Sequence, residues 1–128
     1  MKREQKINPI LREATNVVRN MLMLKGFFVR DIFSMEKDIV DIIAIKEGLL
    51  NSERWRIRII EPSSYGGLST IQIKEFFRDQ AMVHDLKGMI ICLGPISSQA
   101  VKLIEKRRLN VYGLDWLKAN AGFDLKVK

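Results

Sequence analysis

The sequence predicts an α/β fold in which a mixed β-sheet is flanked by helices. Residues 10–25 carry apolar side chains at helical spacing, and several shorter apolar runs have the length of strands. Strands and helices alternate in the second half, which implies parallel strands joined by right-handed crossovers. In the first half, the connection between residues 46 and 54 is so short that the strands it joins must be antiparallel. The predicted order of elements is α-β-β-β-α-β-α-β-α.

The first half is predicted to hold one helix and three strands. The helix covers residues 10–25, where Asn8 can cap it, Pro9 suits its first position and Gly26 ends it. Strands are indicated by three runs rich in β-branched and aromatic residues, at 27–33, 39–46 and 54–61.

The second half begins after a loop at residues 62–67. Ser69 and Gln72 have the spacing of a capping box, which predicts a helix that runs to about His84. The elements that follow are a strand at 88–94, a helix capped by Ser97 or Ser98 and ending at Lys106, a strand at 109–114, a short helix capped by Asp115 and stopped by Gly122, and a loose tail at 123–128.

Composition indicates one soluble domain over residues 1–128. Hydrophobic residues make up 47% and charged residues 29% of the 128 residues, which is typical of globular proteins. No apolar run approaches the ~20 residues that cross a bilayer, and we expect no membrane contact. Cys92 is the single cysteine, so it is expected to be a core residue in a reducing, cytoplasmic setting. The net charge of +7 favours a polyanionic partner, and nucleic acid is the first candidate among such partners.

Two carboxylates interrupt the apolar strands of the predicted hairpin. Asp41 lies inside IVDIIAI, and Glu61 ends IRIIE. With the hairpin centred near residue 50, Asp41 is expected almost opposite Glu61, at the end far from the turn. Two such acids repel unless a cation bridges them or one takes a proton, and Mg²⁺ takes carboxylate oxygens. The sequence thus predicts a Mg²⁺ site and phosphodiester chemistry, whereas Asp38 is expected to be an exposed charge and no small-molecule cofactor is expected. Alternatively, Asp41 and Glu61 are structural acceptors of hydrogen bonds from Ser63, Ser64 and backbone amides of the following loop.

These segments resemble the PD-(D/E)xK nuclease superfamily. VDIIAI followed by IRIIEPS, behind one helix and ahead of a crossover helix, is similar to the archaeal Holliday-junction resolvases, and the later KGMIICLGPISSQAVKLIEKRRLNVYGLDWL is similar to Mrr-type restriction enzymes. The resemblance covers roughly residues 8–118 and implies a restriction-endonuclease-like sheet. It assigns Asp41 and Glu61 as catalytic metal ligands and places Glu13 where some resolvases add a glutamate. Alternatively, Glu13 only pairs with a surface cation.

The sequence departs from that family at its lysine. The position two residues after the second acid is Ser63, which cannot offset charge in a transition state. Lys74 or Arg78, on the second predicted helix, could replace the lost basic group.

Several residues are candidates for contact with nucleic acid. Tyr65 sits in a glycine-bearing loop and could stack on a base, or it could equally serve as a lid over apolar surface. Basic side chains that could contact phosphates are Arg54, Arg56, Arg58, Arg78, Arg107 and Arg108.

Three functional hypotheses follow. The first is a DNA-binding protein, acting as a monomer or a homodimer, with a degenerate nuclease fold and no efficient catalysis. The second is an active Mg²⁺-dependent endonuclease or junction resolvase with a relocated basic residue. The third is a non-catalytic subunit that makes protein–protein contacts.

Overall fold

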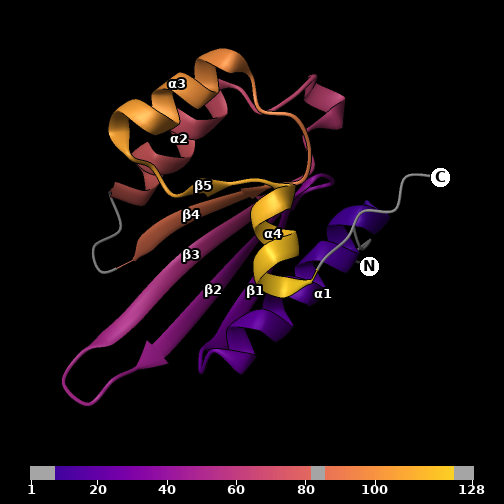
Figure 1. The fold of residues 1–128 in the computed structure, drawn as a ribbon. Helices are drawn as coiled ribbons and strands as arrows, with labels where there is room; N and C mark the ends of the chain where they lie inside the picture. The colour runs from indigo at the N-terminus through magenta and orange to yellow at the C-terminus, as the bar shows by residue number, and fades with distance from the viewer. Residues whose placement is uncertain (1–7, 82–85, 123–128) are drawn as a thin grey trace, which may run out of the picture.

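A computed structural model describes residues 8–81 and 86–122 and confirms the α/β architecture (Figure 1). The predicted succession of helices and strands is also found. The elements are α1 (Pro9–Leu24), β1 (Phe28–Glu36), β2 (Ile39–Glu47), β3 (Ser52–Ile60), a 3₁₀ turn η1 (Ser63–Tyr65), α2 (Thr70–Ala81), β4 (Lys87–Cys92), α3 (Ser98–Arg107), β5 (Val111–Tyr112) and α4 (Leu114–Ala121).

The five strands form one mixed sheet in the order β1-β2-β3-β4-β5. β1, β2 and β3 form an antiparallel meander, because each is joined to the next by a short turn. β4 and β5 run parallel to β3, because α2 and α3 carry the chain back across the sheet.

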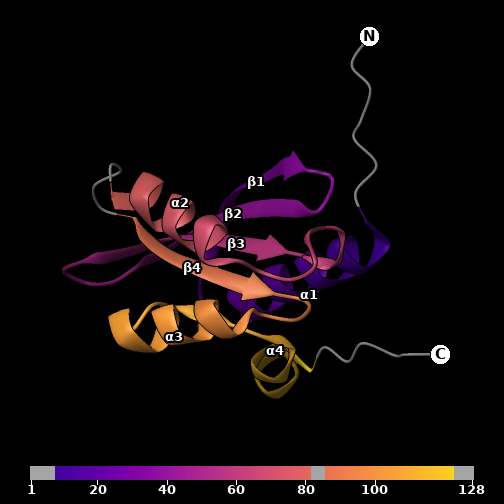
Figure 2. The ribbon, with the colours of Figure 1, turned by 90° about the horizontal axis from the view of Figure 1, so that it is seen from above.

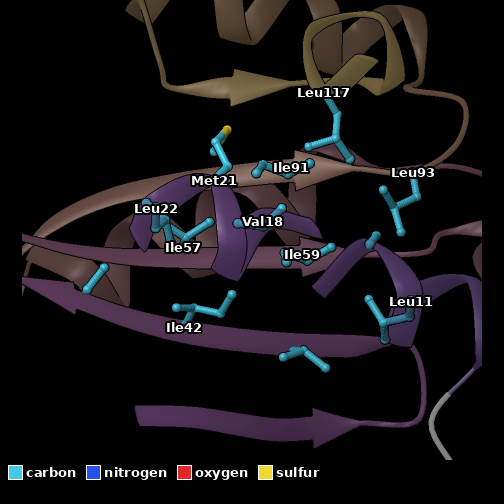
Figure 3. Close-up of a cluster of buried hydrophobic side chains, with 13 residues drawn as sticks. Leu11, Val18, Met21, Leu22, Ile42, Ile57, Ile59, Ile91, Leu93 and Leu117 are labelled. Atoms are coloured by element: carbon cyan, nitrogen blue, oxygen red, sulfur yellow. The ribbon is translucent and has the colours of Figure 1, made fainter. Parts of the chain in front are cut away.

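Helices cover both faces of the sheet (Figures 1 and 2). Buried residues of α1 and α4 pack on one face against Ile42, Ile57 and Ile59, which we call the α1 face (Figure 3). Buried residues of α2 and α3, with Phe76 the largest, pack on the other face against Ile39 and Ile60, which we call the α2 face.

Side-chain caps begin three of the helices at predicted positions. The Asn8 side chain accepts a hydrogen bond from the Ile10 N–H at 2.9 Å and starts α1. Ser69 and Gln72 form the predicted capping box before α2, with the Ser69 N–H donating to Gln72 Oε1 at 3.0 Å. Of the two serines proposed for α3, the structure uses Ser97.

Three other predictions need correction, and two fall outside the described residues. Asp115 does not cap α4, because Gly113 is the N-cap and Asp115 lies in the first turn. β1 extends three residues further than predicted, to Glu36, since it stays paired with β2 up to the turn. β5 shrinks to Val111–Tyr112. The predicted end of α2 near His84 and the tail at 123–128 lie outside the described residues.

Candidate nucleic-acid interface

The hairpin of β2 and β3 sets where both predicted acids lie. Its tip is Leu49–Leu50, closed by a hydrogen bond from the Gly48 N–H to the Asn51 carbonyl at 2.7 Å. Gly48 is required there, because a Cβ would come within 2.4 Å of that carbonyl oxygen. The residue numbers of each pair across the two strands therefore add up to 99, as for Ile39 and Ile60. The predicted hairpin centre near residue 50 implied a sum of about 100 to 102.

The predicted proximity of Asp41 and Glu61 is wrong. Asp41 is opposite Arg58, and Glu61 lies beyond the last paired residue of β3. Because paired residues sum to an odd number, an odd-numbered residue of β2 shares a face with an even-numbered residue of β3. Asp41 therefore points to the α2 face, whereas Glu61 points to the α1 face.

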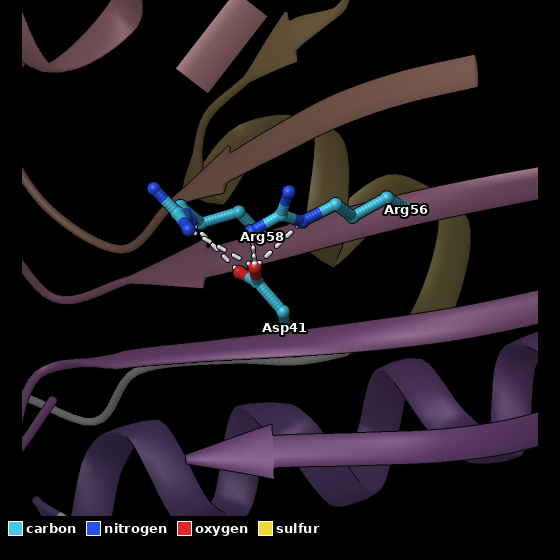
Figure 4. A network of polar contacts seen from close by, with 3 residues as sticks. All are labelled: Asp41, Arg56 and Arg58. Atoms are coloured by element: carbon cyan, nitrogen blue, oxygen red, sulfur yellow. Dashed lines mark hydrogen bonds and ion pairs between the residues drawn. The ribbon is translucent and has the colours of Figure 1, made fainter. Parts of the chain in front are cut away.

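Asp41 lies in a compact ion network with two arginines (Figure 4). Its carboxylate, 1% exposed, accepts hydrogen bonds from Arg58 Nε at 2.8 Å and Nη2 at 3.0 Å, and from Arg56 Nε at 2.8 Å. The two guanidinium carbons lie 5.5 and 5.0 Å from the centre of the Phe76 ring. Buried charge is stable only when it is paired and hydrogen-bonded, and this network supplies both conditions.

Glu61 is held by neutral donors at the other face. Its Oε2 accepts from the Ser63 backbone N–H at 3.1 Å, and its Oε1 accepts from the Ser63 hydroxyl and from Asn8 Nδ2 at 3.4 Å. Asn8 also caps α1, so Glu61 ties that helix to the end of β3. Cys92 lies near this end of the sheet, where burial raises the pKa of its thiol to about 11 and the Glu61 charge adds to the rise.

Asp38 is the acid that lies across from Glu61. The Glu61 N–H donates to the Asp38 carbonyl at 3.0 Å, and the two residues are 7% and 6% exposed. The expectation of an exposed charge at Asp38 is therefore wrong. Counting outward from Leu49–Leu50 in the sequence would have found this pair, had the two-residue tip been recognised.

The predicted Mg²⁺ site at Asp41 and Glu61 does not fit this geometry. The two carboxylates are on opposite faces, Asp41 is neutralised by guanidinium groups, and both Glu61 oxygens accept hydrogen bonds from the chain itself. Within residues 8–81 and 86–122, no group of three or more His, Cys, Asp or Glu side chains converges in a way that could hold a metal ion. We therefore derive no chemistry through a metal at these positions.

Three of the predicted basic residues lie together on the α2 face. Lys74 and Arg78 of α2 and Arg107 of α3 line one groove of about 560 Å³ between the two helices. All three are exposed, and the single acid in the lining is Glu75, so the groove carries a charge of 3 − 1 = +2. The contact between Arg78 and Asp79 is a long, exposed 3.8 Å pair, which leaves Arg78 available to other anions.

The other predicted residues are more scattered. Arg108 is exposed at the C-cap of α3, next to Arg107, in the left-handed conformation. Arg54 is exposed on β3, whereas the guanidinium groups of Arg56 and Arg58 are largely committed to Asp41. Glu13 is exposed on α1, and Lys74, the proposed replacement for the missing lysine, lies on the α2 face, opposite to the face of Glu61.

Tyr65 belongs to a second hollow. It lines a pocket of about 360 Å³ between α2 and the sheet, together with Arg58 and Glu75. Its hydroxyl donates to Glu36 Oε2 at 3.0 Å, so the loop after β3 is tied to the end of β1.

Comparison with known proteins adds no family assignment. The chain matches no protein-family model, no curated protein and no solved structure. None of the helices in the described parts of the chain is long and apolar enough to cross a membrane.

Removing the Asp41 carboxylate should strongly destabilise the fold. Asp41→Ala leaves two guanidinium groups, whose side chains are 19% and 18% exposed, without their partner, and we expect a loss of about 3–5 kcal/mol in chemical unfolding. Asp31→Ala is the matched control, because it breaks the exposed pair with Arg30 and should cost less than about 1 kcal/mol. Equal losses for the two variants would show that the network does not stabilise the sheet.

Proposed function

We propose that this protein binds nucleic acid through the groove between α2 and α3. DNA is the nucleic acid that we propose as the main ligand. The observation that carries the proposal is the gathering of Lys74, Arg78 and Arg107 along one groove. With Arg108 included, α3 holds four basic residues and one acid, a charge of 4 − 1 = +3, so the groove is bordered by the more basic of the two helices. Phosphate contacts by such residues supply affinity without sequence preference.

We also propose kinship with the PD-(D/E)xK nucleases, with a catalytic set that is incomplete. Support comes from the antiparallel meander followed by a crossover helix and a parallel strand, and from the buried acids Asp38 and Glu61, whose backbones are hydrogen-bonded at the end of the hairpin. Ser63 takes the position of the family's lysine, and its hydroxyl is used as a donor to Glu61. A serine held in this way positions the carboxylate but adds no positive charge for a transition state.

DNA binding should weaken steeply as salt rises. Three phosphate contacts predict a slope of log K against log salt of about −2.7, which fluorescence anisotropy with a labelled duplex can measure. The triple substitution of Lys74, Arg78 and Arg107 to Ala should bring this slope close to zero. Arg12→Ala, an exposed residue on α1 at the opposite face, is the matched control and should leave the slope unchanged. A shallow slope in the unaltered protein would contradict the proposed function.

Cleavage assays should show no nuclease activity above background. Linear duplex, branched and single-stranded DNA should all remain intact with Mg²⁺ or Mn²⁺, because Ser63 adds no positive charge for a transition state and both Glu61 oxygens already accept hydrogen bonds from Ser63. Cleavage that disappears in Asp38→Asn or Glu61→Gln would make the inactive interpretation wrong and would favour an active endonuclease.

A second candidate function is contact with another copy of the chain through β1. This strand forms an edge of the sheet, and Phe28, Ile32, Phe33 and Met35 are between 43% and 65% exposed on it. Exposed apolar edges readily pair with other strands. Antiparallel pairing of two β1 strands about Phe33 would place Arg30 of one copy opposite Glu36 of the other.

Sedimentation equilibrium of variants in which the charges at Arg30 and Glu36 are reversed tests this homodimer. Arg30→Glu should weaken self-association, because like charges would then meet across the pairing. Combining it with Glu36→Arg should restore association. A monomer at all concentrations, or a double variant no stronger than the single one, would exclude this arrangement.

A further inference from the structure

The pocket beside Tyr65 has the construction of a small-ligand site. Its volume of about 360 Å³ lies at the lower end of the range of about 300–1,000 Å³ for small-molecule pockets. Its lining includes Ile39, Ile60 and Ile90, which are buried and come from three different strands. Met35, 45% exposed, adds apolar surface that a flat ring could cover.

Both negatively and positively charged side chains surround this apolar surface. Glu75 of α2 and Glu36 of β1 offer carboxylate acceptors, and Arg58 offers a guanidinium group that is held in place by Asp41. Tyr65, 45% exposed, adds an aromatic ring. An aromatic ring and an apolar surface favour a planar ligand, and carboxylates favour a ligand with N–H donors.

The pocket adjoins the basic groove. Glu75 lines both hollows, so it marks the place where the groove between α2 and α3 meets the pocket between α2 and the sheet. A strand whose phosphates follow Lys74 and Arg78 would pass beside the opening of the pocket. Its bases can enter only when they are unpaired, because duplex bases are stacked and their pairing edges are occupied.

We propose that this pocket receives one unpaired, amino-bearing base of the bound strand, with Glu75 accepting from the exocyclic amino group. Cytosine offers such a donor at N4, whereas thymine offers an acceptor at the same place. The inference rests on the proposed nucleic-acid function and adds to it a preference for single-stranded or unpaired substrates.

A comparison of the affinities for oligo(dC) and oligo(dT), each about 12 nucleotides long, tests the proposal at one fixed salt concentration. We expect oligo(dC) to bind about fivefold or more tightly than oligo(dT), as measured by fluorescence anisotropy. Glu75→Gln should reduce that ratio towards one. Electrostatics alone predicts a different result. Removing a negative charge should raise the affinity for both oligonucleotides equally and leave the ratio of the two affinities unchanged.

Asp79→Asn is the matched control, since Asp79 is an exposed acid one helical turn further along α2 and does not line the pocket. This substitution should raise the affinity for both oligonucleotides and leave the ratio of the two affinities unchanged. Tyr65→Phe should retain binding through the ring, and Tyr65→Ala should weaken oligo(dC) more than oligo(dT).

The outcomes separate this inference from the proposed function. An unchanged ratio in Glu75→Gln, or binding to duplex alone, would overturn the base pocket and leave nucleic-acid binding intact. Absence of binding to every nucleic acid would overturn both. Cytidine monophosphate that binds more tightly than oligo(dC) would assign the pocket to a free nucleotide and overturn entry of a strand.

Discussion

The register of the β2–β3 hairpin determines which partners the buried acids meet. A tip of two residues, closed between Gly48 and Asn51, fixes which side chains of the two strands share a face. A shift of one residue would bring every side chain of β3 to the opposite face. The register therefore decides that Asp41 meets two arginines and that Glu61 meets the N-terminus of α1.

The consequence is that each buried acid is satisfied in a different way. On the α2 face, Asp41 offsets the charges of Arg56 and Arg58, which allows an otherwise costly run of basic residues to lie in an interior strand next to Phe76. On the α1 face, Glu61 accepts from Ser63 and Asn8 and connects the sheet to the first helix. Acids used in this way hold the fold together, and their lone pairs are largely occupied by the chain.

The proposed binding functions depend instead on α2. Its buried residues Ile73 and Phe76 anchor it to the sheet, while Lys74, Glu75 and Arg78 stay exposed. One side of the helix faces α3 and the basic groove, and the other side faces the pocket beside Tyr65. A single amphipathic helix can thus present phosphate contacts and base contacts next to each other, because its exposed residues lie between two hollows.

The sequence by itself determined the order of the elements, the mixed sheet and the caps of α1, α2 and α3. Apolar periodicity found each helix and strand, and local residue chemistry found Asn8, the Ser69–Gln72 box and the serines before α3. These features are decided within a few residues of the chain, where spacing and hydrogen-bonding capacity are sufficient. The same holds for the burial of Cys92 in the most apolar strand.

Only the tertiary structure decided which acids meet. The predicted pairing of Asp41 with Glu61 was three residues out of register, because its residue numbers sum to 102 and the observed pairs sum to 99, which places Asp38 across from Glu61. Pairing between strands depends on the geometry of the turn, and a two-residue tip with two leucines lacks the glycine or asparagine that usually marks it in a sequence. Likewise, Lys74, Arg78 and Arg107 come from two helices, and only the packing of α2 beside α3 places them in one groove.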